Sequence, residues 1–495
     1  LSLSATASAT AVGKSEQIVE AREIIRTYEK ATGSKLHEGK TMVYRMGPTR
    51  NEKMTNKSIG VKFKIMEDED SEAYLGDVIG NQVGEKTRFE PILSKVGKLA
   101  DAWNKENIGI FGRSVVANTL MLAKIKHRAD VNALSQTMKK KILEEFKTFV
   151  WKGKGKRARV KWQVMVREPK KGGIGIKDPI CELDASKIRM LIRLLTRNRQ
   201  PWMKWIERKL IRVAKRWEVP EAMAAKPTKK QIKELRESCI VESTLKTWIE
   251  IGGTWKEPKG EQKEEEQKDN EEKKTVTGFG VEHAKEWTPI EQLKTKLVYA
   301  ILIEKRMKLK GYSPRKAHES IDGIQKKLTA NERDYWWRMT HGLISVRKIE
   351  SKWKKKENGE PVGSKCPMCD ETEDREHYEY GCKDSEELRK RVAIRAGRQP
   401  PLISREEWAL EVEVEEDMKM MIATARWIYH CERCKIDLGK RRRMNIKIVM
   451  QKLDRRLETA EEAKKKKEEV NKKRKEAANK RKEQANKQKE QLIII

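Results

Sequence analysis

The chain has 495 residues, 38% of them charged against about 25% in ordinary globular domains, and its formal net charge is +35. A positive excess of this size predicts a polyanionic partner, above all RNA or DNA, although a merely soluble Lys/Glu-rich protein is the alternative. No apolar run approaches the roughly 18 residues of a membrane span, so we expect a soluble protein without a membrane partner.

Residues 1–80 are expected to form an α+β layer. Apolar Ile18, Ala21, Ile25 and Tyr28 recur at helical spacing, and Gly33 can end this helix. A helix crossing to a small antiparallel sheet is the simplest arrangement. The sheet would be formed by three short β-like runs at 41–46, 59–65 and 74–79.

Residues 81–217 have the periodicity of a helical domain. A helix at 181–197 and the PWMKW segment from Pro201 close this module. Two apolar faces define its earlier helices. One face consists of Phe89, Ile92, Val96, Leu99 and Trp103, and the other face consists of Met138, Ile142, Phe146 and Phe149.

A basic stretch at 151–178, reading WKGKGKRARVKWQVMVREPKKGGIGIKD, interrupts the helical pattern. Its glycines can let a basic backbone approach a partner closely, which makes it a candidate phosphate-binding segment. A solvated basic loop that ends in a glycine turn is the alternative. The candidate nucleic-acid contacts are Lys152, Lys154, Lys156, Arg157, Arg159, Lys161, Lys170, Lys171 and, outside the stretch, Arg113.

The segment after this module is expected to hold a helix and then a linker at 256–278, which has almost no apolar residues. Helical patterning returns from 281, where Trp336, Met339 and Leu343 form a stripe that we assign to a core rather than to a base-stacking platform. The predicted domains are 1–80, 81–217, 218–280, 281–455 and 456–495.

The C-terminal tail, from residue 456, is rich in Lys and Glu. Its apolar positions are too small and too sparse for a coiled-coil seam, which leaves a single solvated helix or a disordered basic tail. Three basic clusters can be nuclear import signals or phosphate contacts. They lie at 440–443, 472–475 and 480–482.

Four ligand-type residues between the helical segments have the spacing C-x2-C-x7-H-x4-C: Cys366, Cys369, His377 and Cys382. Three thiolates and an imidazole suit one tetrahedral zinc ion with a structural role, although chance clustering is the alternative. The acidic loop between the ligands argues against phosphate binding by this site.

A second C-x2-C pair, Cys431 and Cys434, follows His430 inside a helical pattern. No fourth ligand is near it in the sequence, so we do not expect a second metal site there. An odd total of seven cysteines with metal-type spacing favours a reducing compartment.

Several segments, taken in chain order, carry a resemblance to a known family. They read KLHEGKT at 35–41, GRSVVANTL at 112–120, FVWKGK at 149–154, EPKKGGIGIKD at 168–178, PWMKW at 201–205 and DYWWRMTHGLISVRK at 334–348, followed by the CCHC cluster. Together they resemble the C-terminal half of a non-LTR retrotransposon reverse transcriptase of the type found in fungal elements: the end of the palm, the thumb and the zinc-binding domain.

The resemblance implies phosphoryl transfer by two divalent ions that carboxylates of the palm would hold. The family's Tyr-Ala-Asp-Asp tetrad aligns with Thr6, Ala7, Ser8 and Ala9, where both aspartates are missing. Lys40 matches the lysine that the family places near the incoming triphosphate. We therefore expect this chain alone to be inactive as an RNA-directed DNA polymerase, with magnesium relevant only if a palm is supplied.

The chain begins at Leu1 rather than Met, and we expect a degenerate remnant of such an enzyme. Its fold would be mainly α, with a small α+β palm remnant, a helical thumb, a helical zinc-binding domain and a basic tail. Its partners would be RNA and DNA, the element's own RNA included, in the nucleus or in a cytoplasmic ribonucleoprotein. There are two alternatives. In the first, the chain is part of an active enzyme whose palm is supplied upstream or in trans; in the second, it is a non-enzymatic helical interaction protein.

Overall fold

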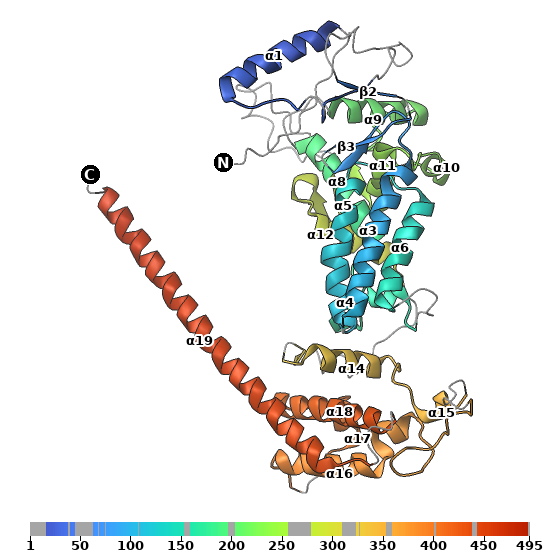
Figure 1. Ribbon diagram of the computed structural model, residues 1–495, viewed down its shortest axis with the longest axis vertical. Helices are drawn as coiled ribbons and strands as arrows, with labels where there is room; N and C mark the ends of the chain where they lie inside the picture. Colours follow the sequence, from blue (N-terminus) through green and yellow to red (C-terminus); the bar gives the residue numbers. More distant parts are fainter. Residues whose placement is uncertain are drawn as a thin grey trace. The chain divides into compact units, whose positions relative to one another are not determined.

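Figure 1 shows the computed structural model, in which 63% of the described residues are helical and 7% lie in strands. This confirms the predicted mainly-α fold with a small α+β part. The predicted linker at 256–278 lies outside the described residues. The structure describes residues 16–37, 40–44, 63–67, 69–74, 76–106, 108–152, 159–196, 203–255, 279–308, 323–325, 327–352, 359–399, 402–437 and 443–493.

The chain divides into two compact units, each built from three segments. Unit 1 comprises residues 1–106, 116–156 and 177–308, and unit 2 comprises residues 107–115, 157–176 and 309–495. The short internal segments of unit 2 come from the region where the sequence predicted a single helical module. The finer domain boundaries given above stay predictions.

Unit 1 begins with α1 (Glu16–Thr32), which ends where Gly33 adopts a φ of +72° and donates its N–H to the Glu29 carbonyl. Two strand pairs follow: β1 (Met42–Tyr44) with β2 (Lys64–Met66) in parallel, and β3 (Glu72–Tyr74) with β4 (Asp77–Ile79) in antiparallel. The predicted antiparallel pairing is wrong for β1 and β2, whose connection over 45–63 is long enough for a crossover. The run at 74–79 belongs to a hairpin that turns at Gly76, with φ +86°.

The helices of unit 1 bury most of the two apolar faces that the sequence indicated, with Val96, Ile142 and Phe146 fully enclosed, whereas Leu99 and Trp103 are half-buried. Ser135 begins α6 by accepting a hydrogen bond from the Met138 N–H at 3.2 Å. The helices are α3 (Glu85–Lys105), α5 (Leu122–Ala129), α6 (Gln136–Val150), α8 (Pro179–Thr196), α9 (Met203–Trp217), α10 (Lys229–Lys233), α11 (Ile240–Glu250) and α12 (Thr295–Arg306), with a π-helical turn at Ala117–Met121 and a 3-10 turn at Ile290–Gln292.

A buried group of charges on α8 links three helices of unit 1. Asp184, 1% exposed, lies 2.8 Å from Arg306 Nη1 of α12 and 3.3 Å from Lys139 Nζ of α6. Lys187, one turn along α8, is buried beside it at 3.6 Å. Burial acts to raise the pKa of Asp184, but the charges of Lys139, Lys187 and Arg306 outweigh it and hold this pKa below its usual value.

A three-stranded antiparallel sheet in unit 1 was not predicted. β5 (Gly253–Trp255) pairs with β6 (Phe279–His283), which pairs with β7 (Glu286–Pro289). The ring of Trp248 packs directly against Gly253 of β5, because a Cβ at this position would lie 2.2 Å from the ring. The sheet extends the core formed by α8, α9, α11 and α12.

Unit 2 packs its helices around an aromatic core. Trp336, 2% exposed, donates its indole N–H to the Ala423 carbonyl at 3.1 Å, and Met339 is buried beside it, so these two residues of the predicted stripe belong to a core. The third residue of the stripe, Leu343, is half-buried. Leu410, with φ +57°, separates α17 from α18. The helices are α4 (Ile110–Val116), almost wholly in this unit, α7 (Trp162–Met165), α14 (Ala330–Thr340), α15 (Arg347–Glu350), α16 (Lys383–Arg395), α17 (Arg405–Ala409), α18 (Glu416–Asp437) and α19 (Ile446–Ile493), with a 3-10 turn at Pro169–Lys171 and a π-helical turn at His377–Gly381.

The tail is one long helix, so of the two predicted alternatives the structure has the solvated helix. α19 buries Val449 and Leu453 against unit 2. Its sequence then repeats every seven residues as VNKKRKE, AANKRKE and QANKQKE over 470–490. Glu–Lys pairs four residues apart, such as Glu469 and Lys473 at 2.7 Å, support such a helix without a partner. None of the described helices combines the length and apolar composition needed to cross a membrane.

Candidate metal centre

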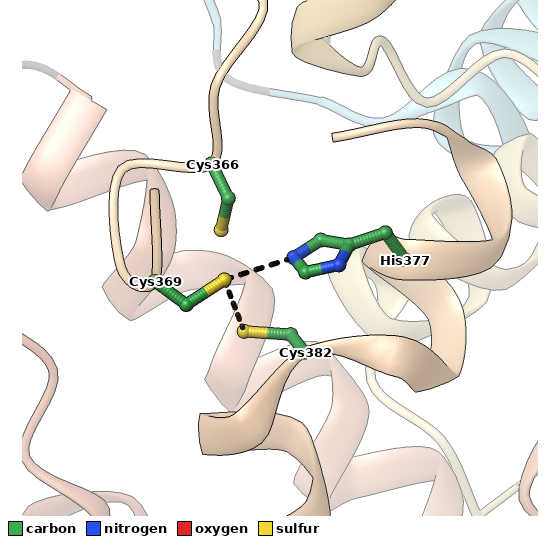
Figure 2. Close-up of side chains that lie close together, drawn as sticks. All are labelled: Cys366, Cys369, His377 and Cys382. Carbon is green, nitrogen blue, oxygen red and sulfur yellow. Dashed lines mark hydrogen bonds between the residues drawn. The ribbon is translucent and has the colours of Figure 1, made fainter. Parts of the chain in front are cut away.

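Four side chains converge in unit 2 as the sequence spacing predicted. One ligand atom from each of Cys366, Cys369, His377 and Cys382 lies within 4.8 Å of every other, and Figure 2 shows them pointing toward a common centre. Cys369 Sγ is 3.2 Å from His377 Nε2 and 3.9 Å from Cys382 Sγ. Among the described residues, no other group of three or more potential metal ligands is present.

Two local structures position the ligands. Cys366 and Cys369 flank a tight turn that closes when the Cys366 N–H donates to the Glu371 carbonyl at 2.7 Å, with Asp370 at φ +61°. His377 begins a π-helical turn, and Cys382 follows that turn at the start of α16. The tight turn therefore supplies Cys366 and Cys369, and the π-helical turn with the start of α16 supplies His377 and Cys382.

Acidic residues of the loop orient the histidine. The Asp374 carboxylate accepts the His377 backbone N–H at 3.0 Å, and Glu371 Oε2 lies 3.4 Å from His377 Nδ1. The Nε2 atom is thus left facing the sulfur atoms. A carboxylate on the distal nitrogen is the usual way in which proteins fix the tautomer and direction of a metal-binding histidine.

The buried thiols of Cys366 and Cys382 shift each other's pKa in opposite directions. The hydrogen bond between Cys366 and Cys382 raises the pKa of Cys366 and lowers that of Cys382 to about 4. Tyr429 and the first backbone N–H groups of α16 also lower the pKa of Cys382. The cluster therefore carries negative charge in a largely buried position, which a bound cation would neutralise.

The geometry fits a tetrahedral ion. With metal–sulfur bonds of about 2.3 Å, tetrahedral sulfur ligands lie about 3.8 Å apart, close to the 3.9 Å between Cys369 and Cys382. Cys366 and Cys382 are 1% and 2% exposed, and His377 is 8% exposed. The four residues can hold one metal ion that is largely shielded from solvent.

Glu373 anchors this loop to α18. Its side chain is fully buried, and both of its carboxylate oxygens accept from Arg433 Nη2 in an ion pair; the Arg433 guanidinium lies 4.9 Å from the Tyr378 ring centre. The Glu373 carbonyl also accepts the Lys348 N–H at 2.9 Å. The sequence analysis counted Glu373 only as one of the acids of this loop, because its partner is 60 residues away.

The second C-x2-C pair, Cys431 and Cys434, lies on α18 among packed side chains. His430 Nδ1 lies 2.7 Å from the Tyr378 hydroxyl, and burial raises the pKa of Cys431 to about 12. In the described part of the chain, Cys431, Cys434 and His430 belong to no cluster that could hold a metal.

The other predicted site residues, which are the nucleic-acid contacts, the degenerate catalytic motif and Lys40, divide into three groups. Arg113, in the middle of α4, is 1% exposed, and burial lowers its pKa while the nearby Asp334 acts to raise it. The prediction is wrong for Arg113, since a buried guanidinium beside a carboxylate does not reach a phosphate. Thr6, Ala7, Ser8, Ala9, Lys154, Lys156 and Arg157 lie outside the described residues. Lys40, Lys152, Arg159, Lys161, Lys170 and Lys171 are exposed.

The glycines of the basic stretch serve its own turn. Gly172 adopts a φ of +83°, and a Cβ on Gly173 would lie 1.8 Å from the Arg167 carbonyl oxygen. The Trp337 indole donates to the Gly172 carbonyl at 3.1 Å and fixes the turn on α14. The turn presents its two lysines to solvent, at Lys170 and Lys171.

Comparison with known proteins adds no identification, because no protein-family model and no curated protein matches this chain. The interpretation of the metal cluster and of the charge distribution is therefore based on the residues of this chain alone.

Proposed function

We propose that this protein binds nucleic acid through exposed lysines and arginines on a helical scaffold that a zinc ion holds together. The observation that carries the proposal is the charge: 111 basic against 76 acidic residues. Cations that a fold keeps exposed create a field that attracts phosphates. Two described segments supply them, the turn at 159–171 and the solvated part of α19.

Zinc is the ion that best suits the metal cluster. Three cysteines and one histidine with tetrahedral spacing are a common structural zinc set, and four protein ligands leave no open position for a substrate. The ion would hold the knuckle, the π-helical turn and α16 together, a contribution of ~10 kcal/mol or more to local folding. Its role would be architectural, because acidic residues surround it.

We further infer a relationship to the C-terminal half of non-LTR reverse transcriptases, supported by the order of the motifs in the sequence. With Ser8 and Ala9 at the positions of the family's aspartates, this chain would bind a template without extending a primer by itself. Incorporation of nucleotides would require carboxylates from an upstream or separate palm. Primer extension with the purified chain is expected to give no product. Binding in the nucleus, on RNA or DNA, is part of the same proposal.

The direct test is a fluorescence anisotropy titration of the zinc-loaded full chain against labelled single-stranded RNA, single-stranded DNA and duplex DNA of equal length at low salt. Saturable binding to at least one of them is expected, with displacement by unlabelled competitor. Absence of binding to all three would remove the proposal. An intact metal cluster without nucleic-acid binding would instead favour a helical interaction protein.

A further inference from the structure

The solvent face of α9 carries an unusual combination of side chains. The opposite face provides the core contacts of this helix, with Met203, Ile206, Leu210, Val213, Ala214 and Trp217 all buried. Trp205 is not part of that face, and 48% of its surface is exposed. At 100° per residue it shares its face with four cations. These are Arg208, Lys209, Arg212 and Arg216.

Trp205 also lines a groove in unit 1. The groove has a volume of about 390 Å³ and runs between α9, the start of α11 and the segment after α5. Three cations border it, Arg88, Lys209 and Arg236, and none of its lining residues is acidic. Lys209 Nζ lies 5.7 Å from the centre of the Trp205 ring, which keeps a positive charge beside the exposed indole.

The cation on the far wall is held in place. Arg236 donates from Nε and Nη2 to Glu242 Oε1 at 3.0 and 2.8 Å, and Glu242 is 3% exposed in its side chain. The side chain of Arg236 nevertheless stays 61% exposed. A guanidinium fixed by a buried carboxylate can meet a ligand with little further loss of conformational freedom.

We propose that this groove binds a single strand of nucleic acid, with one base stacked on Trp205 and the adjoining phosphates at Lys209, Arg236 and the cations of the α9 face. The inference rests on the proposed function and names its subsite. An exposed indole flanked by cations is the arrangement by which proteins hold unpaired bases. In a duplex the base faces are covered by their neighbours, so this site would prefer a strand to a duplex. The volume, at the lower end of small-ligand sites, suits a single nucleotide unit.

The test uses the full zinc-loaded chain and a labelled 12-nucleotide single strand, with a duplex of the same length beside it. Trp205→Ala is expected to weaken strand binding roughly 5- to 100-fold and duplex binding much less. Trp205→Phe should restore most of the affinity, because the stacking surface returns. Ile211→Ala is the matched control: Ile211 is 52% exposed on the same helix but lies away from the Trp205 face, and its loss should leave strand binding unchanged.

Salt dependence separates the two parts of the site. Trp205→Ala should leave the slope of log K against log salt unchanged, whereas Lys209→Gln should reduce its magnitude by about 0.7 for the lost phosphate contact. Equal strand affinity in wild type and Trp205→Ala would overturn this inference while leaving the proposed function standing. Equal loss for strand and duplex, or tighter Trp205-dependent binding of polyglutamate, would also overturn it. Failure of the wild type to bind any nucleic acid would reject the proposed function itself.

Discussion

The carboxylate of Glu373 and the guanidinium of Arg433 form a buried ion pair that joins the metal-binding loop to α18. The side chains are 1% and 5% exposed, so neither charge can turn to water if the other is removed. The metal ligands and the helical core of unit 2 are therefore coupled through one charged contact as well as through the chain.

Glu373→Gln is expected to destabilise unit 2 by about 3–5 kcal/mol, because Arg433 would be left buried without its counter-charge. Hydrogen exchange at α18 amides measures the change in the free energy of opening. The double variant with Arg433→Met should cost less than the sum of the two single variants. A loss below about 1 kcal/mol for Glu373→Gln would contradict a buried, coupled pair.

Cys366→Ser is expected to abolish stoichiometric metal binding and to release the 364–382 segment from protection against exchange, since three ligands remain and the site opens to solvent. Native mass spectrometry gives the metal content and its identity. Cys431→Ser is the matched control, because Cys431 belongs to no described metal cluster and should retain the ion. Full metal occupancy in Cys366→Ser would refute the assignment of this ligand.

Unit 1 should lose stability in acid through Asp184. The unfolded Asp has a pKa of about 3.9, and in the fold this pKa is lowered, so between the two values the unfolded chain binds more protons. The stabilisation is present above about pH 3.9 and disappears as the pH falls through the folded value. The difference in opening free energy at α8 between wild type and Asp184→Asn should therefore shrink from about pH 6 to about pH 3. A difference that is constant with pH would contradict this account.

Lys170→Gln with Lys171→Gln should lower the magnitude of the salt slope by about 2 if both lysines contact phosphates. The matched control is Lys95→Gln with Lys98→Gln, two exposed lysines on α3 that should change the slope little. Equal effects from the two pairs would mean that the basic turn is not a preferred contact. Arg113, buried beside Asp334, is not expected to contribute to the slope.

The sequence was informative where the determinants are local. The metal ligands lie within seventeen residues and their spacing encodes the site, and Gly33 marked the end of α1 through its own backbone preference. Helical faces such as that of α6 followed from periodicity. The seven-residue repeat of α19 is also a local feature of the sequence. It was not predicted, because it consists of Lys and Glu rather than the apolar residues of a coiled-coil seam.

Features that depend on distant residues were missed. β5 and β6 are three and five residues long and are separated by the 256–278 segment, so neither carries a recognisable pairing signal. The burial of Arg113 depends on packing near Asp334 and that of Glu373 on Arg433, and neither partner is close in sequence.

The most direct test of the central claim is a filter-binding titration of the zinc-loaded wild-type chain with nucleic acid over increasing salt. If six phosphates are contacted, log K should fall linearly with log salt with a slope of about −4 to −5. An association constant that does not change with salt would show that the positive charge of this protein does not serve nucleic-acid binding, and would contradict the account.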